Sequence, residues 1–128
     1  MSRDYRTMRA MLLLVARSRR DLSFSDLASL SDGWSSRRSI VCEAGRLRDE
    51  GLIESDMEFD ASGVSLGGSI SGLTGAGEEF ARLIENDDVW RICLKTLDAA
   101  GVDLSHPLLR EVCEAIVKRY VMGFIPKE

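Results

Sequence analysis

The sequence has little proline, histidine, cysteine and aromatic content, and each shortage excludes a class of protein. Its 128 residues include two prolines, one histidine and three cysteines, while aromatic residues make up 6%. Scarce proline together with 45% hydrophobic residues excludes a disordered chain. Cys42, Cys93 and Cys113 are odd in number and widely spaced, which is typical of neither a disulfide framework nor a zinc motif. We therefore expect one folded, helix-rich, reduced protein with no metal and no cofactor.

Long apolar runs are also missing. The longest one, residues 10–16, falls well short of the roughly 20 residues that span a bilayer, and Arg17, Arg19 and Arg20 follow it. No secretory signal is recognisable either. We expect a cytoplasmic protein with no membrane partner.

The residues needed for catalysis are equally scarce. A nucleophile needs a positioned base, and the single histidine, His106, stands before Pro107 where a helix is expected to begin. We expect no enzyme activity and no small-molecule substrate.

Charge is distributed unevenly along the chain. Residues 1–48 hold ten arginines and five acidic residues, whereas residues 49–128 hold seven basic and sixteen acidic residues, giving +5 and −9 within the total of −4. A basic half beside an acidic half suggests two faces with different partners.

Helical periodicity in the first half predicts three helices, over residues 4–19, 25–30 and 36–50. Ser25 and Asp26 are the expected N-caps of the second. On the third, one face carries Ile40, Ala44 and Leu47 for packing. The opposite face carries a different set: Arg38, Cys42, Gly45, Arg46 and Asp49.

Loose alternation over 52–59 and 64–73, around the turn sequence at 60–63, predicts a β-hairpin, with a kink at Gly67 and Gly68. Further helices are expected over 74–84 and 88–99, and a last one opened by Ser105 and Pro107. The predicted fold is mainly α with a small β-hairpin wing. It is a winged helix-turn-helix domain at 1–86 followed by a helical C-terminal extension at 87–128, with Leu47, Leu73, Phe80 and Trp90 buried.

The last helix is unusually rich in apolar residues. They cover a stripe wider than one packed face requires, so part of it is expected to meet a second surface. We predict a homodimer through Leu109, Val112, Ile116, Tyr120 and Phe124.

Two segments have a specific sequence pattern. The first runs from Ile70 to Phe80 (ISGLTGAGEEF) and continues in 87–90; the second combines Leu47 with 50–53. Together they are similar to a family of short bacterial and phage proteins known as domain of unknown function twenty-five-thirteen. The similarity covers roughly residues 4–97. It implies a winged-helix fold and a mobile-element origin but no established activity.

The leading functional hypothesis is a DNA-binding regulator of mobile-element type. Arginines of the first and third helices would hold double-stranded DNA: Arg6, Arg9, Arg37, Arg38, Arg46 and Arg48. Acidic residues along the predicted wing, at 54, 56, 58 and 60, would repel phosphate. The alternatives are therefore a protein-binding module, such as a phage-encoded inhibitor of a host defence complex, or an assembly subunit.

Overall fold

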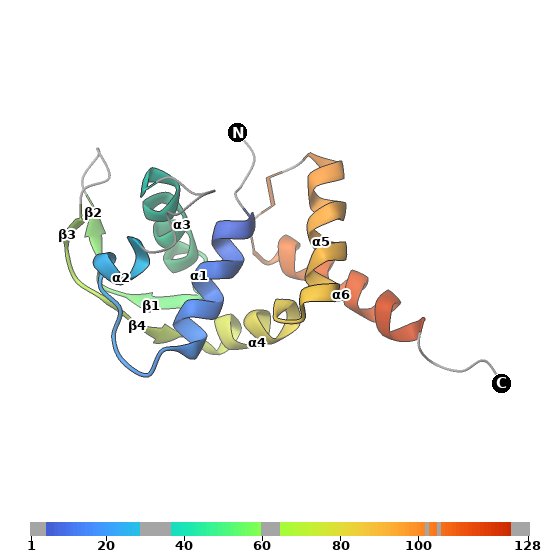
Figure 1. Cartoon of the computed structure of the whole chain (residues 1–128), viewed down its shortest axis with the longest axis horizontal. Coiled ribbons are helices and arrows are strands. Elements are labelled where there is room, and N and C mark those ends of the chain that lie inside the picture. Colours follow the sequence, from blue (N-terminus) through green and yellow to red (C-terminus); the bar gives the residue numbers. More distant parts are fainter. Residues whose placement is uncertain (1–4, 29–36, 60–64, 102, 105, 124–128) are drawn as a thin grey trace. The chain divides into compact units, whose positions relative to one another are not determined.

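The protein is mainly helical and contains one small antiparallel hairpin, as predicted (Figure 1). The computed structural model describes residues 5–28, 37–59, 65–101, 103–104 and 106–123. Contacts divide the chain into two compact units, Asp4–Ala81 and Arg82–Glu128. The predicted boundary after residue 86 stays a prediction.

In the first unit, helix α1 (Tyr5–Arg17) packs against helix α3 (Arg37–Asp49). The apolar side of α1 is buried at Tyr5, Met8, Leu12 and Val15, which confirms the helical spacing in the sequence. The predicted packing face of α3 is also confirmed, because its three residues Ile40, Ala44 and Leu47 are buried. These two faces hold α3 in a fixed orientation on α1.

The short helix α2 (Phe24–Ala28) begins one residue earlier than the predicted start at residue 25. Ser23, and neither Ser25 nor Asp26, is its N-cap. The Ser23 amide donates to Asp26 Oδ2 at 2.8 Å, and the Asp26 amide donates to Ser23 Oγ at 3.4 Å. This reciprocal arrangement is a capping box, in which an acidic residue three places after the cap satisfies the cap's own amide.

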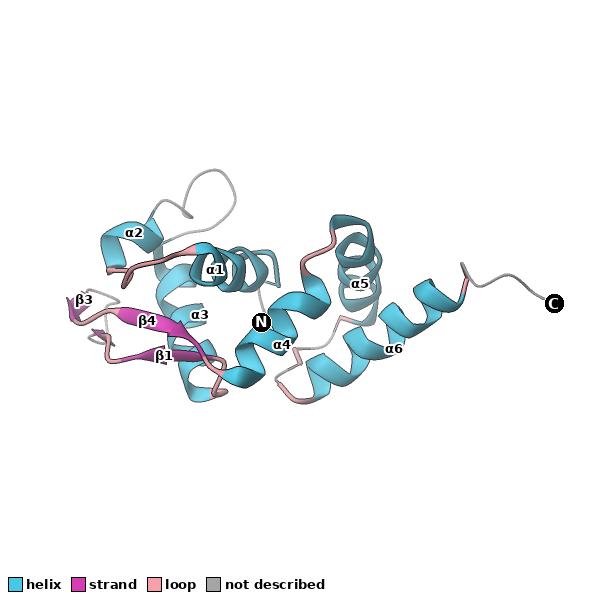
Figure 2. Cartoon of the chain, turned by 90° about the horizontal axis from the view of Figure 1, so that it is seen from below, coloured by secondary structure: helices cyan, strands magenta, loops and turns pink. Residues whose placement is uncertain are grey.

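The hairpin has two ladder segments separated by a corner. β1 (Ile53–Ser55) pairs antiparallel with β4 (Ile70–Leu73), and β2 (Glu58–Phe59) pairs with β3 (Ser65–Gly67). Figure 2 shows β1 and β4 running side by side. The kink expected at Gly67 and Gly68 is confirmed, because both have positive φ angles, of 124° and 91°, between β3 and β4. The predicted turn at 60–63 lies outside the described residues.

A third segment joins this sheet on the free edge of β4. Leu22 and Ile70 exchange two backbone hydrogen bonds, of 2.9 and 2.8 Å, as an isolated antiparallel bridge. The chain between α1 and α2 is thereby fixed to the same strand that pairs with β1.

The hairpin is joined tightly to helix α4 (Gly75–Ile84) through Thr74. The Thr74 amide donates to Leu52 O at 3.1 Å, its hydroxyl donates to Gly51 O, and the Gly77 amide donates to that hydroxyl at 3.0 Å. Thr74 is thus the N-cap of α4, as predicted. The helix approaches Leu52 so closely that a Cβ on Gly77 would lie 1.9 Å from the Leu52 carbonyl oxygen.

The second unit contains helices α5 (Asp87–Ala100) and α6 (Leu108–Met122), which pack against each other. Asn86 caps α5 by accepting hydrogen bonds from two amides, and Gly101 ends it in the left-handed conformation with φ 65°, which glycine adopts readily. Pro107 occupies the N-cap position of α6, one residue before its expected place in the first turn, and Ser105 lies outside the described residues. In the described ranges, none of the helices has the length and apolar character needed to cross a membrane.

Because α4 approaches Leu52 closely, we expect replacement by alanine to affect stability differently at two glycines in the first turn of this helix. Gly77→Ala forces a methyl group against a backbone carbonyl, and overpacking of this kind costs about 1–3 kcal/mol or more. Gly75→Ala is the matched control, since a Cβ there has no neighbour within 4 Å. Urea unfolding is expected to show destabilisation for Gly77→Ala alone. Equal midpoints for the two variants would contradict the described junction.

Candidate nucleic-acid interface

The outward side of α3 is the surface that we predicted from the sequence to bind DNA. Cys42 and Asp49 are exposed there, and Gly45 and Arg46 are half-buried. The opposite side of the helix is buried and α3 packs on α1, so the orientation of the outward face is fixed.

The lack of a side chain at Gly45 leaves open space in the middle of this face, which we call the open strip. A Cβ at Gly45 would meet no atom within 4 Å, beyond its chain neighbours and the backbone of its own helix. Among the residues that the structure describes, no packing therefore requires glycine at this position. In a helix interior glycine costs about 1 kcal/mol relative to alanine, and a close external approach is one reason to keep it.

Two arginines expected to meet DNA have partners inside the chain. The Arg48 guanidinium donates to Met57 O at 2.7 Å, which ties α3 to the corner of the hairpin. Arg46 Nε lies 3.9 Å from Glu50 Oε1, and its side chain is 27% exposed. Arg48 is thus a tether between elements, whereas Arg46 pairs with Glu50, takes part in a further interaction within the chain and remains partly exposed to solvent.

The other predicted arginines divide into two groups. Arg6 is exposed and Arg9 is half-buried on α1, and each takes part in an interaction within the chain. Arg37 and Arg38 begin α3, but their side chains lie outside the part of the molecule that the structure describes. The first turn of α3 therefore stays a predicted contact.

Acidic side chains line the hairpin beside α3. Glu54, Asp56 and Glu58 are exposed, as the predicted acidic wing requires; Asp60 lies outside the described residues. The Asp56 carboxylate accepts from the Ser69 amide at 2.8 Å, so part of this charge also stabilises the corner. Electrostatically, this end of the surface repels phosphate.

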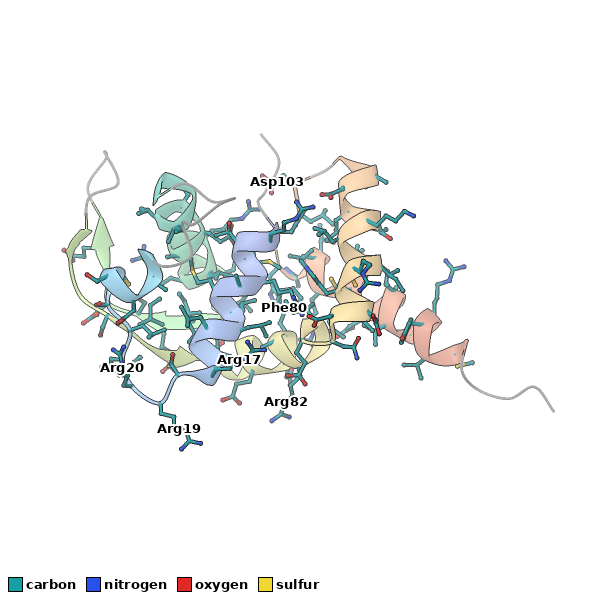
Figure 3. The ribbon with its side chains drawn as sticks, viewed as in Figure 1. Arg17, Arg19, Arg20, Phe80, Arg82 and Asp103 are labelled. Atoms are coloured by element: carbon teal, nitrogen blue, oxygen red, sulfur yellow. The ribbon has the colours of Figure 1, made fainter. Side chains whose placement is uncertain are left out.

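The sequence interpretation overlooked three arginines at the end of α1, in a turn that also contains Asp21. Arg17, Arg19 and Arg20 are exposed (Figure 3). Arg20 forms two hydrogen bonds with the Asp26 carboxylate, of 2.9 and 3.1 Å, and with the Ser23 amide they hold the pKa of Asp26 well below its usual range. For Arg17 and Arg19, the described chain offers no hydrogen bond or ion pair. Clustering of Arg17, Arg19 and Arg20 in the sequence was the available signal.

A buried acid on α3 was also unexpected. Glu43 is only 5% exposed and takes part in an interaction within the chain. Because a buried carboxylate is costly unless it is hydrogen bonded or paired, Glu43 belongs to the support of α3 rather than to its outer face.

The predicted dimerisation residues of α6 differ in accessibility. Leu109 was predicted to lie in the dimer interface, but its side chain is fully buried inside the protein and is not available to a partner. Val112, Ile116 and Tyr120 are half-buried, and Phe124 lies outside the described residues. The exposed apolar residues of this helix are instead Leu108, Val121 and Met122, at 57%, 52% and 58%.

The three cysteines are free thiols in different settings. Cys42 is exposed on α3, contrary to a purely packing role, while Cys93 and Cys113 are fully buried on α5 and α6. Hydrogen bonding to Cys93, followed by burial, raises the pKa of the Cys113 thiol. Across the described residues, no three potential ligands are grouped so that they could hold a metal ion.

Comparison with known proteins adds no assignment to this geometry. No protein-family model, curated protein or solved structure matches the chain. The similarity to the phage and bacterial family stays a prediction from the residues at 47–53 and 70–90.

The open strip at Gly45 predicts a stabilising substitution. Gly45→Ala should raise the free energy of unfolding by about 1 kcal/mol, because alanine is the better helix former and its methyl group meets nothing. Urea or thermal unfolding of the purified protein measures the change. Destabilisation by alanine would mean that Gly45 is required by packing inside the chain.

Proposed function

We propose that the first unit is a winged-helix module and that the protein is a DNA-binding regulator of mobile-element type. The order α1, bridging segment at Leu22, α2, α3 and hairpin supports this assignment. In such modules the helix before the hairpin enters the major groove.

The observation that carries the proposal is the outward face of α3. It is supported from behind by α1 and is open at Gly45, with Arg46 one residue further on. An arginine on such a face can donate two hydrogen bonds to guanine, and an adjacent glycine lets the helix come close to the base edges. To do so, the Arg46 guanidinium would exchange its interactions within the chain, including the 3.9 Å pairing with Glu50, for the base.

A protein partner is the second candidate, and the exposed acids at Glu54, Asp56 and Glu58 favour it. They repel a duplex but suit a basic partner surface, as in an inhibitor of a host defence complex. A pull-down from host lysate with and without nuclease distinguishes the two candidates, since only DNA-mediated capture is lost after digestion.

The DNA proposal predicts that a long neutral side chain at position 45 blocks binding. Gly45→Gln should fold, because the site is open, and should lower duplex affinity at least about 10-fold by holding α3 away from the groove. Fluorescence titration against genomic and random fragments at two salt concentrations gives the affinity and its salt dependence.

The matched control for this substitution is Ala99→Gln, an exposed helical position on α5. It should bind like the parent. Unchanged affinity of Gly45→Gln would show that α3 does not face the duplex. Absence of salt-dependent binding by the parent, even at low salt, would remove the regulator proposal and leave the protein-binding one.

We further propose that α6 forms a homodimer, with its exposed apolar residues in the interface. Glu111 in the first half of α6 and the cations Lys118 and Arg119 in the second half are exposed, while Glu114 pairs with Arg110 inside the helix at 2.7 Å. Two antiparallel copies of the helix would therefore bring opposite charges together beside the apolar residues.

The dimer proposal predicts the effect of charge at the end of α6. Val121→Asp combined with Met122→Asp should convert a dimer into a monomer, because carboxylates would be buried in the interface. Light scattering at tens of micromolar measures the mass. Ile92→Asp, at a 42% exposed position of α5, is the control and should stay dimeric. A monomeric parent would contradict the proposal.

A further inference from the structure

Two arginines in and next to the turn that follows α1 differ from the other arginines whose side chains are described in the first unit. Arg46 and Arg48 of α3 have partners inside the chain, and so do Arg6 and Arg9 of α1. Arg17 and Arg19 are exposed, and among the described residues nothing bonds to their guanidinium groups. Guanidinium groups without an internal partner can bind phosphate without first breaking an ion pair.

The backbone of this turn is anchored at both ends. On the helix side, the Ser18 hydroxyl donates to Leu14 O at 2.8 Å and the Ser18 amide donates to Val15 O at 3.2 Å. On the other side, Leu22 is fixed to Ile70 by two hydrogen bonds. A ligand therefore meets a turn whose conformation is already set, and this lowers the entropy lost on binding.

The ion pair between Arg20 and Asp26 gives the turn a third attachment, to helix α2. Their paired hydrogen bonds, of 2.9 and 3.1 Å, neutralise Asp26, so this carboxylate does not compete for Arg17 or Arg19. Asp21, which is exposed, is the acidic residue that remains in the turn. Figure 3 shows Arg17, Arg19 and Arg20 around the end of α1, with Arg19 projecting away from the ribbon.

We infer that Arg17 and Arg19 form a phosphate-binding surface for the DNA backbone, separate from the outward face of α3. This inference rests on the proposed DNA binding and deepens it. Phosphate contacts position a protein on the duplex and carry no sequence information. The surface supplies the positive charge that the acidic hairpin and the internally paired arginines of α3 do not.

A purely structural role is the competing explanation, and it applies to Arg17 in particular. Arg17 lies in the last turn of α1, where positive charge stabilises a helix by a few tenths of a kcal/mol to about 1 kcal/mol. Arg19 lies beyond the helix end. The two roles differ in their readout, since a structural role changes the melting temperature and leaves the salt dependence of DNA binding unchanged.

The test is a salt titration of duplex binding by the full chain carrying Arg17→Gln and Arg19→Gln. Each phosphate contact contributes about −0.9 to the slope of log affinity against log salt, so losing two should flatten the slope by about two units. The difference in affinity between genomic and random fragments should stay the same. Arg82→Gln with Lys95→Gln is the charge-matched control, because both positions are exposed and lie in the second unit.

Three outcomes are distinct. A flatter slope with preserved sequence preference, and no change in the control, supports the surface. If the parent binds DNA and the double variant keeps its slope, the inference is wrong while the proposed function stands. If the parent binds no duplex at low salt, the inference and the proposed function are both wrong.

Discussion

The close approach of α4 to the backbone of Leu52 is the constraint on which the first unit depends. At this point the end of α3, the beginning of β1 and the beginning of α4 meet within one hydrogen-bonded junction around Thr74. Only a glycine at position 77 allows the helix to come so near. Because β1 pairs with β4, and β4 in turn bridges to Leu22, the junction also sets the position of the chain that connects α1 to α2.

Positive charge in this unit is largely used for structure. Arg48 ties α3 to the hairpin and Arg20 holds the capping box of α2 through Asp26. A charge-assisted hydrogen bond to a carbonyl or carboxylate is strong enough to fix such a contact, and it must be broken before the guanidinium can meet a ligand. The net charge of a segment is therefore a poor guide to its binding surface, since what matters is which charges are left without an internal partner.

In the C-terminal unit the decisive feature is how much of the apolar surface of α6 is buried. Leu109 and Cys113, both in the first half of α6, are fully buried, whereas Leu108 at its start and Val121 and Met122 near its end are exposed. A helix with exposed apolar residues has surface to offer a second molecule. This division could not be read from the stripe itself, because periodicity shows which residues share a side of a helix and not how far along that side a neighbour extends.

The sequence by itself determined the helices, the hairpin and most of their ends, because periodicity, Thr74, Asn86 and Gly101 act over a single turn of chain. It also identified the packing face of α3. Only the tertiary structure decided which arginines have partners inside the chain, because the partners of Arg20 and Arg48 lie six and nine residues away on other elements. The same reason applies to Gly77, whose requirement comes from Leu52, a residue far away in the chain that only folding brings into contact.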